Sequence, residues 1–562
     1  MTMNKTIDGS FKTSFAANIF RFKYAQNPSD TWDQLADRLV EDVCGTRWGT
    51  SNKLMADDDR KQLAQYIKEM KFVPGGRYLY YAGRPFKAYN NCYLLRAEED
   101  TREEWSSVTW RAMSCLMTGG GIGIDYSRLR AAGKTLSRTG GTASGPIPLM
   151  YAINEIGRNV MQGGSRRSAI YASLNWQHPD VNKFLVTKNW TPEVRAAKEK
   201  DFNAHAPLDM TNISVNYDDA SLGGYTVVDG KVTSNELASN PIFLQNVRQA
   251  METGEPGFSF NFGDKQNETL RNACTEVTSE DDSDVCNLGS INMGNITSLE
   301  EFKSVVELGS KFLVCGTLRA DLPYEKVYKV REKNRRLGLG LMGIHEWLLK
   351  RKSSYEVTPE LHTWLKEYKD GSEAAANSHC DRLFVSRPAA YRAIAPTGSI
   401  GILAGTTTGI EPLFAVSYKR RYLTDGTKWR YEYVVDSTAD LLIKEYDLAP
   451  ESIDTAYKLS HNYEQRIKFQ ADVQDYVDMS ISSTINLPSW NAKGNEESSV
   501  GVFASILAKY APRLRGFTCY PDGSRGGQPL TEVPYEEAMK HKGVIFEEHD
   551  ICDISGGGTC GS

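Results

Sequence analysis

From about residue 70 onward, the chain consists of short apolar segments interrupted by glycine, and this texture limits the folds open to it. Two such stretches are FVPGGRYLYYAG and MTGGGIGIDYSRLRAAG. Short apolar runs bounded by glycine are typical of buried strands that alternate with helices. The chain has 562 residues and shows no internal repeat or low-complexity block. We therefore expect an α/β fold built as one large unit.

The first 70 residues have a helical pattern instead. Apolar side chains recur at helical spacing over residues 29–43, and Ser29 or Asp30 is placed to cap the first turn. The recurring apolar residues are Trp32, Leu35, Ala36, Leu39, Val40 and Val43. Farther along, residues 254–263 (GEPGFSFNFG) alternate phenylalanines and predict a strand, and most of 299–350 is predicted to be helical.

The composition excludes several classes of protein. With 40% hydrophobic residues, 24% charged residues and a net charge of −5, the chain offers no basic surface for nucleic acid. It contains no apolar run of 18 residues, and its N-terminus lacks the charged-then-apolar layout of a secretory signal. We expect a cytoplasmic protein that binds neither nucleic acid nor a membrane.

One short segment carries reactive side chains at regular spacing. Residues 271–277 (RNACTEV) place an amide, a thiol and a carboxylate at every second position: Asn272, Cys274 and Glu276. In an extended backbone these side chains leave on one face about 6.6 Å apart. A thiol beside a base suggests nucleophilic or radical chemistry, and the alternative is a buried, inert cysteine among chance polar neighbours. Another cysteine follows in CNLGSIN (286–292).

The other cysteines decide between metal and redox chemistry. Ten cysteines in 562 residues are too few for a disulfide scaffold. No C-x2-C pair exists and the eight histidines form no H-x3-H cluster, so we expect no metal site. Cys552 and Cys560 flank three glycines at the C-terminus, which permits the close approach of a disulfide. An unpaired chain end is the alternative.

Glycine-rich segments offer places for a nucleotide phosphate. Residues 119–123 and 140–145 flank SRLR, and 162–167 (QGGSRR) repeat the combination of free amides and guanidinium groups. Each alone also fits a plain turn. Residues 395–400 (APTGSI) supply hydroxyls and amides at a predicted helix start. The G-x-G-x-x-G order in LGLGLMG follows REKNRR instead of an apolar strand, which disfavours a dinucleotide fold, and no P-loop pattern is present.

Taken together, the segments resemble the large catalytic subunit of ribonucleotide reductases over roughly residues 70–530. The shared pieces, in the family's order, are NNCYLL, GGGIGIDYSRLRAAG, QGGSRR, NACTEV, CNLGSIN, RRLGLGLMG, APTGSIGILAGTTTGIEP and the C-terminal cysteine pair. The resemblance implies a ten-stranded α/β barrel of two five-stranded parallel halves with a central finger loop. It divides the chain into an N-terminal helical region (1–70), the catalytic barrel (71–530) and a flexible C-terminal redox tail (531–562).

The resemblance also implies the reaction, which is reduction of ribonucleotides to 2′-deoxyribonucleotides for DNA synthesis. Cys274 matches the thiyl radical that removes hydrogen from C3′. Glu276 matches the base for the 3′-hydroxyl proton, and Asn272 matches the amide that orients the ribose hydroxyls. Cys92 and Cys286 match the dithiol that supplies two electrons and becomes a disulfide.

Binding partners follow from the same likeness. Thiol exchange with Cys552 and Cys560 would reset the site, since an extended chain from Thr531 to Cys552 spans up to about 70 Å, and a thioredoxin-like protein would reduce the tail. The implied substrate-binding residues are Asn91, Gly121, Pro396, Thr397, Gly398, Ser399 and Ile400. The implied deoxynucleotide effector residues are Asp100, Arg130, Gln162, Gly163, Gly164, Ser165 and Arg166. In most relatives the specificity loops lie near a two-fold interface, so the resemblance implies a homodimer. The cysteines that match no role, and are expected to be buried as small apolar residues, are Cys44, Cys115, Cys315, Cys380 and Cys519.

The radical source separates the members of this family. Residues 516–525 (GFTCYPDGSR) look like the adenosylcobalamin-dependent class II enzymes, and the only Tyr-Tyr pair, Tyr80-Tyr81, lies too early for the class I pattern. Class II members usually carry Pro and Gly where this chain has Ala273 and Thr275. The alternatives are therefore a class I large subunit that needs a separate metal-containing subunit, and a catalytically silent nucleotide-binding regulatory protein.

Overall fold

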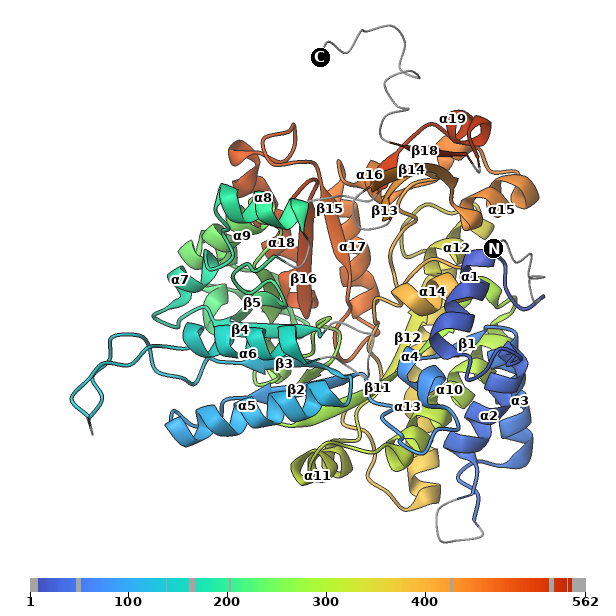
Figure 1. The fold of residues 1–562 in the computed structure, drawn as a ribbon, viewed down its shortest axis with the longest axis horizontal. Helices are drawn as coiled ribbons and strands as arrows, with labels where there is room; N and C mark the ends of the chain where they lie inside the picture. The colour runs from blue at the N-terminus through green and yellow to red at the C-terminus, as the bar shows by residue number, and fades with distance from the viewer. Residues whose placement is uncertain are drawn as a thin grey trace, which may run out of the picture.

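The structure is a computed structural model that describes most of the chain. The described ranges are 9–46, 52–137, 139–160, 168–201, 204–424, 428–524, 530–542 and 544–547. Within these ranges, none of the helices combines the length and the apolar character needed to cross a bilayer. The fold is mixed α/β, as the glycine-interrupted texture predicts (Figure 1).

A ten-stranded sheet forms the centre of the molecule. Its strands are β1 (Phe72–Pro74), β2 (Cys92–Arg96), β3 (Gly121–Asp125), β4 (Ile170–Asn175), β5 (Thr211–Tyr217), β8 (Gly257–Phe260), β11 (Asp284–Asn292), β12 (Leu337–Met342), β15 (Thr484–Leu487) and β16 (Gly516–Pro521). Every residue of β11 and β12 is buried. Such continuous apolar burial is typical of strands covered on both faces.

The sheet consists of two parallel groups that run against each other. Strands β2, β3, β4, β5 and β8 pair in parallel in that order. Strand β11 pairs in parallel with β12, and β15 pairs in parallel with β16. The two groups meet through antiparallel pairs, β2 with β11 and β8 with β16. The cysteines at 92 and 286 lie on the first of these junctions.

A short segment, residues 390–394, lies between β12 and the chain that leads into β15. Ala393 donates its N–H to Leu339 of β12 over 3.2 Å, and Ile394 donates to Ser480 over 3.2 Å. Both contacts are parallel bridges, Leu339 with Arg392 and Ile394 with Ile481. Residues 390–394 therefore connect the β11–β12 pair to the β15–β16 pair within the second group.

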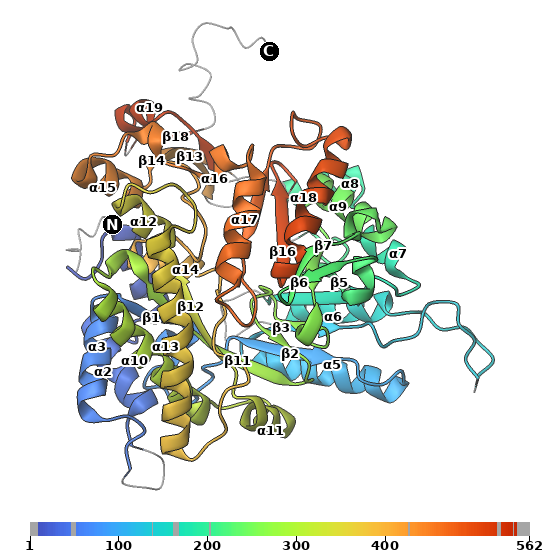
Figure 2. The same ribbon diagram turned by 180° about the vertical axis from the view of Figure 1, so that it is seen from behind.

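Helices cover the outside of the sheet (Figures 1 and 2). On the side of β2 to β8 these are α5 (Arg102–Met117), α6 (Ile147–Asn159), α7 (Val181–Leu185), α8 (Pro192–Lys200), α9 (Pro241–Thr253) and α18 (Val500–Tyr510). On the side of β11, β12 and β15 they are α4 (Gly76–Tyr81), α10 (Leu299–Arg319), α11 (Glu325–Asn334), α12 (Ile344–Lys350), α13 (Pro359–Leu383), α14 (Gly398–Ala404), α16 (Ala456–Leu459) and α17 (Tyr463–Gln474). The N-terminal helices are α1 (Ser14–Ile19), α2 (Trp32–Cys44) and α3 (Asp57–Lys68).

The predicted N-terminal helix is confirmed as α2, and all six of its predicted apolar residues are buried. Its cap differs from the prediction. The hydroxyl of Thr31, rather than Ser29 or Asp30, accepts from the Gln34 N–H, and the Gln34 side-chain oxygen accepts from the Thr31 N–H. This reciprocal capping box satisfies two amide groups at once, so the helix begins one residue later than an Asp30 cap and two residues later than a Ser29 cap would give.

Two other sequence expectations concern longer stretches. Most of 299–350 is helical, as predicted, in α10, α11 and α12, but LGLGLM forms the buried strand β12. Two short parts of the segment predicted to be a flexible tail pair with other strands: β17 (Leu530–Glu532) pairs with β13 (Ser417–Thr424), and β18 (Ile545–Glu547) pairs with β14 (Lys428–Val435). This separate four-stranded sheet, with α15 (Ser437–Tyr446) and α19 (Tyr535–Lys540), lies at the top right of Figure 1.

Candidate active site

Cys92 and Cys286 are direct partners across the antiparallel β2–β11 junction. Both are reduced and buried. Directly opposed residues of an antiparallel pair have Cα atoms about 4.5 to 5.5 Å apart, which lies within the range that a disulfide requires. The two strands therefore hold a dithiol that can close into a disulfide without moving the backbone.

Asn272, Cys274 and Glu276 lie at the tip of a hairpin and not on an extended strand, which corrects the sequence prediction. The stem strands are β9 (Leu270–Arg271) and β10 (Thr278–Ser279). At the tip Thr275 has a φ of 68° and donates its N–H to the Asn272 carbonyl over 3.0 Å. The alternating polar pattern suggested a strand because the sequence gives no sign of this turn, which has no glycine.

The hairpin tip lies between the two parallel groups. A Cβ at Gly123 of β3 would come within 1.7 Å of the Arg271 carbonyl oxygen, so only glycine fits there. Asn212 of β5 donates to the Ala273 carbonyl over 3.4 Å. On the other side, the Ser480 N–H donates to the Glu276 carbonyl over 2.8 Å. Residues of β3 and β5 on one side, and of the chain that leads into β15 on the other, thus fix the position of the hairpin.

The tip brings its amide and carboxylate to the dithiol. Asn272 Nδ2 donates to Cys92 Sγ over 2.8 Å, and Asn272 Oδ1 accepts from the Val277 N–H over 2.9 Å. Cys92 Sγ lies 3.9 Å from Glu276 Oε1. Burial raises the pKa of Cys92, and the negative charges of Glu276 and Cys274 raise it further. Cys92 is therefore held as a neutral thiol.

Glu276 has the electrostatics of a base that works near neutral pH. Its side chain is buried, and burial raises the pKa of this carboxyl to about 7, against the lowering effect of the Asn272 hydrogen bond. Among the described residues no group bonds to its second oxygen, Oε2. This oxygen is free to receive a proton from a bound molecule.

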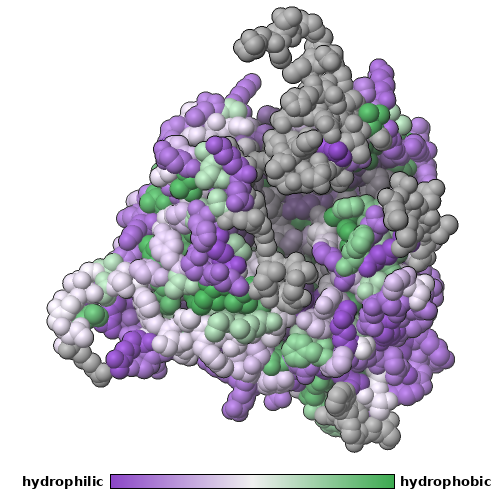
Figure 3. All heavy atoms as spheres, viewed as in Figure 1, coloured by the Kyte–Doolittle hydropathy of each residue, from purple (hydrophilic) through white to green (hydrophobic). Residues whose placement is uncertain are grey.

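Cys274 differs from the other two thiols because it is exposed. The negative charge of Cys274 raises the pKa of Cys92, which places Cys274 near the dithiol. The face shown in Figure 3 is hollowed near its centre, between the two sides of the molecule. An exposed thiol close to a buried thiol pair and a buried base is open to a reagent from solvent.

A buried ionic cluster holds the hairpin stem, and sequence reasoning missed it. Glu268, which precedes β9, accepts from Thr278 Oγ1 of β10 over 2.8 Å and from Arg515 over 2.9 Å, and lies 3.5 Å from Arg336. Burial alone would raise the pKa of Glu268, but the charges of Arg515 and Arg336 outweigh it and lower the pKa to about 2. No short-range motif reveals this cluster, because its members come from separate parts of the chain.

The predicted phosphate cradle is a helix start, as expected. Thr397 has a φ of 50° and precedes α14, and its hydroxyl accepts from the Gly409 N–H over 2.8 Å. Pro396 and Gly398 are exposed, Ser399 is half-buried, and Ile400 is buried. The first amides of a helix have no partner within it. Lys23, which sequence reasoning missed, donates from Nζ to Ser399 Oγ over 3.0 Å.

Only some of the remaining predicted binding residues lie in the part of the chain that the structure describes. The Asn91 carbonyl accepts from the Gly121 N–H over 2.9 Å, beside the dithiol at the start of β2 and β3. Arg130 Nε donates to Asp100 Oδ2 over 2.5 Å, so the two effector candidates bind each other. The effector candidates Gln162, Gly163, Gly164, Ser165 and Arg166 and the tail cysteines Cys552 and Cys560 lie outside the described residues. The cysteines without a predicted role, namely Cys44, Cys115, Cys315, Cys380 and Cys519, are buried as expected.

Comparison with known proteins gives a consistent result. The family described as "Ribonucleotide reductase, barrel domain" matches residues 90–363 and 386–511. The vitamin B12-dependent ribonucleoside-diphosphate reductase of Mycobacterium tuberculosis is 26% identical over 84% of this chain and 73% of its own. The vitamin B12-dependent enzyme of Thermoplasma acidophilum is 25% identical over 86% and 68%. A putative adenosylcobalamin-dependent ribonucleoside-triphosphate reductase of Mycobacterium phage D29 is 26% identical over 92% and 83%.

Proposed function

Because the chain belongs to the ribonucleotide reductase family, we propose that it reduces ribonucleotides to 2′-deoxyribonucleotides by thiyl-radical chemistry at Cys274. The observation that carries the proposal is the convergence of Asn272 and Glu276 on Cys92, at 2.8 and 3.9 Å, with Cys286 paired directly opposite. A silent nucleotide-binding protein would have no need for this complete set.

The first half of the reaction uses the hairpin tip. The Cys274 thiyl radical takes the C3′ hydrogen of the ribose, a step that suits sulfur because S–H and C–H bonds are of similar strength. Glu276 takes the 3′-hydroxyl proton on Oε2, which has no other partner among the described residues. With a pKa of about 7, the carboxylate both accepts and returns a proton near neutral pH.

The second half uses the dithiol. The 2′-hydroxyl leaves as water after protonation, and Cys92 and Cys286 supply two electrons and two protons as they close into a disulfide. Because Cys92 is held as a thiol, it is a proton donor as well as a reductant. Cys274 then returns hydrogen to C3′ and is regenerated as the radical.

We assign the radical source to adenosylcobalamin, following the names of the three relatives. The exposed position of Cys274 fits a bulky group that binds from solvent, and Cys274 and its neighbour Thr275 are the residues that would face it. When bound, adenosylcobalamin supplies the one-electron oxidising equivalent that converts the Cys274 thiol to a radical. The Tyr80-Tyr81 pair lies on α4, where Tyr80 packs on Arg84 and Tyr81 packs on Arg77. We therefore give this pair a structural role and no role in radical transfer.

The finer architecture that we propose is a closed ring of ten strands. It would comprise the central sheet without β1, together with residues 390–394. Support comes from the bridges of Arg392 to Leu339 and of Ile394 to Ile481 and from the two antiparallel junctions. In such a ring the hairpin 270–279 would be the central finger loop.

Substrate phosphates are proposed to bind Thr397, Gly398, Ser399 and the Ile400 amide, with Pro396 shaping the loop and Lys23 adding positive charge. Asn91 and Gly121 would line the ribose. For the effector, the half-buried Asp100–Arg130 pair is a switchable contact, since a nucleotide phosphate would compete for Arg130. Residues 162–166 are proposed to form the other part of that site.

Tail cysteines Cys552 and Cys560 are proposed to reduce the Cys92–Cys286 disulfide and to be reduced by a thioredoxin-like protein. From Glu547 to Cys552 an extended chain spans only about 17 Å. The reach rises toward 70 Å only if β17 and β18 leave their sheet. We therefore expect a Cys552→Ser variant to turn over with dithiothreitol and to fail with thioredoxin.

A homodimer is proposed to form through α5 and α6. Trp110 and Met117 of α5 are 52% and 61% exposed, and Tyr151 of α6 is 39% exposed. Large apolar side chains on two adjacent helices are typical of an interaction surface. Two copies that pack these helices together would bring two Asp100–Arg130 regions toward one interface.

Assay of the purified chain with each ribonucleotide, adenosylcobalamin and a dithiol tests the function. The expected result is deoxynucleotide product from this chain alone and none from Cys274→Ser, because an alcohol O–H bond is too strong to exchange hydrogen with C3′. Product that forms only after addition of a second, metal-containing protein would overturn the cobalamin assignment. No product in either case would overturn the reductase function.

A further inference from the structure

Cys44, Cys315 and His379 form a cluster that takes no part in the chemistry at Cys274. Cys44 ends α2, Cys315 lies on α10 and His379 lies on α13. The Cys315 Sγ is 3.3 Å from His379 Nε2, and the two thiols are hydrogen-bonding partners of each other. Three helices therefore bring two thiols and an imidazole together.

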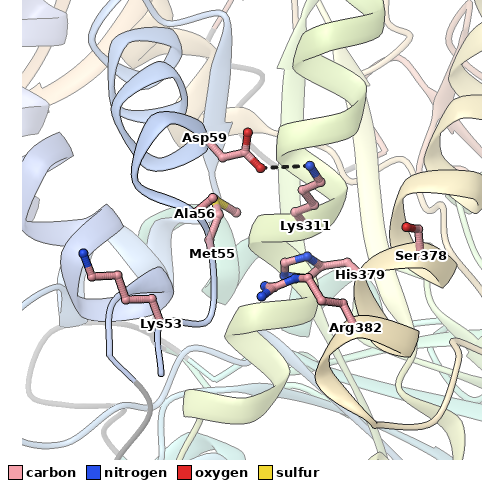
Figure 4. A pocket seen from close by; sticks show the side chains of 8 residues that line it. All are labelled: Lys53, Met55, Ala56, Asp59, Lys311, Ser378, His379 and Arg382. Atoms are coloured by element: carbon pink, nitrogen blue, oxygen red, sulfur yellow. Dashed lines mark hydrogen bonds and ion pairs between the residues drawn. The ribbon is translucent and has the colours of Figure 1, made fainter. Parts of the chain in front are cut away.

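A cavity of about 380 Å³ lies directly beside this cluster (Figure 4). Its lining residues are Lys53, Met55, Ala56, Asp59, Lys311, Ser378, His379 and Arg382. His379 lines the cavity and its Nε2 also contacts the Cys315 sulfur, so this imidazole connects the cavity wall to the thiol. Figure 4 shows His379 and Arg382 reaching from α13, opposite the 2.9 Å ion pair of Lys311 with Asp59.

The surroundings of Cys315 differ from those of the other buried cysteines. Burial acts to raise its pKa, but hydrogen bonds with Cys44 and His379 and the charge of Arg382 outweigh it and lower the pKa to about 6. Burial raises the pKa of Cys380 to about 11 and that of Cys519 to about 12. Thiolate is the reactive form of cysteine, so Cys315 is set apart from ordinary core cysteines.

We propose that Cys315 and Cys44 are an oxidation-sensitive thiol pair, modified by small hydroperoxides that enter through the cavity beside His379. The Cys315 thiolate attacks one peroxide oxygen, the O–O bond breaks, and the departing hydroxide takes a proton from His379 to form water. Cys315 is then a sulfenic acid. Cys44 attacks this sulfur, the S–O bond breaks, and a second water leaves with the Cys44 proton. The two thiols lose two electrons and hydrogen peroxide becomes two molecules of water.

The size of the reagent and the packing of the helices support this assignment. Hydrogen peroxide is close in size to water, so it reaches a thiol that lies behind one side chain. A bulky alkylating reagent does not reach such a thiol. Cys44 and Cys315 have no exposed surface. The resulting disulfide would join the last residue of α2 to α10, covalently tying the N-terminal helical region to the helix that packs on β11 and β12.

Oxidation of the full chain, followed by peptide mass spectrometry, tests the proposal. The protein is treated with hydrogen peroxide at pH 7, its remaining thiols are blocked in denaturant, and the digest is searched for disulfides. We expect a Cys44–Cys315 linked peptide, while Cys115, Cys380 and Cys519 stay reduced. The Cys92–Cys286 disulfide gives a different linked peptide and is scored separately.

Two variants sharpen the result. His379→Gln should slow formation of the Cys44–Cys315 link at least tenfold, whereas His362→Gln, a change at an exposed histidine of the same helix, should leave the rate unchanged. Reductase turnover of Cys44→Ala should stay at the wild-type level, because Cys44 is outside the proposed active site. Oxidation of Cys315 no faster than that of Cys519, or an unchanged rate in His379→Gln, would overturn the proposal.

Discussion

The side-chain amide of Asn272 donates to the sulfur of Cys92 over 2.8 Å. The group proposed to hold the ribose is thus engaged with the group proposed to reduce it. Entry of a substrate must exchange this bond for one to a sugar hydroxyl, while Asn272 Oδ1 keeps its bond to the Val277 N–H.

Replacing Asn272 should therefore impair the chemical step. We expect Asn272→Ala to lower kcat about 10²-fold or more, since loss of one positioned polar group at a reacting centre has effects of this size. Steady-state kinetics measures kcat, and equilibrium binding of the ribonucleotide serves as the control and should persist. An unchanged kcat would show that Asn272 does not orient the substrate.

Glu276→Gln should separate activity from stability. In the folded protein burial raises the pKa of Glu276 from 4.5 to about 7, so the folded state binds the proton more tightly than the unfolded state. The carboxyl therefore costs nothing below pH 4.5 and destabilises the fold increasingly as the pH rises to about 7. At pH 8 the cost is on the order of 3 kcal/mol.

We accordingly expect Glu276→Gln to abolish turnover and yet to unfold at a higher temperature than wild type at pH 8, with no difference at pH 4. Wild-type kcat should also rise with pH through about 7 as the base loses its proton. Thermal melts at the two pH values and a pH–rate profile check both parts. A variant less stable than wild type at pH 8 would contradict the buried-carboxylate account.

Thr275→Gly should stabilise the hairpin tip. Thr275 adopts a φ of 68°, a region that a β-branched residue enters only with strain of about 1 to 3 kcal/mol. Glycine removes this strain but loses more backbone entropy on folding, so a net gain of about 1 kcal/mol is expected. Chemical denaturation measures it, and turnover should be retained. A loss of stability would mean that the Thr275 side chain makes contacts that outweigh the strain.

How well each of these features can be predicted from the sequence depends on how far apart along the chain its residues lie. Helix α2 was predictable because its periodicity and its cap lie within a few residues of each other, although Thr31 took the place of the expected cap. The turn at Thr275 was not predictable, because a non-glycine residue in a left-handed conformation is fixed by surroundings such as Gly123 and Ser480. Contacts across hundreds of residues leave no local trace.

Lys23 illustrates such a contact, and its role can be measured. It reaches Ser399, 376 positions away, from the N-terminal region. We expect Lys23→Gln to raise KM for the ribonucleotide about two- to fivefold with kcat unchanged, which corresponds to the up to about 1 kcal/mol of one exposed ion pair. Lys61→Gln, which neutralises an exposed lysine paired with Asp58 on α3, is the control. Equal KM values for both variants would remove Lys23 from the phosphate site.

Glu268 connects the position of the reactive hairpin to an ionic cluster. Glu268 lies just before β9, and its carboxylate accepts from Thr278 of β10. The same carboxylate forms ion pairs with Arg515 and Arg336. Because the pKa of Glu268 is lowered from 4.5 to about 2, its contribution to stability is present above pH 4.5 and is lost as the pH falls through 2. Its size is on the order of 3 kcal/mol.

Glu268→Gln should thus lower the free energy of unfolding at pH 7 by about 3 to 5 kcal/mol, because the buried Arg515 loses the carboxylate that it binds and Arg336 keeps only Asp284. The variant should also lose much of the acid dependence of stability between pH 5 and 2, and its kcat should fall more than its KM changes, because the tip that carries Cys274 is released. Asp30→Asn, which neutralises another buried carboxylate that binds Arg38 on α2, tests whether any buried ion pair has these effects. If both variants show the same fall in kcat, the effect is not specific to the contacts of Glu268 with the hairpin. A fall confined to Glu268→Gln would show that the hairpin stem positions Cys274 for the reaction.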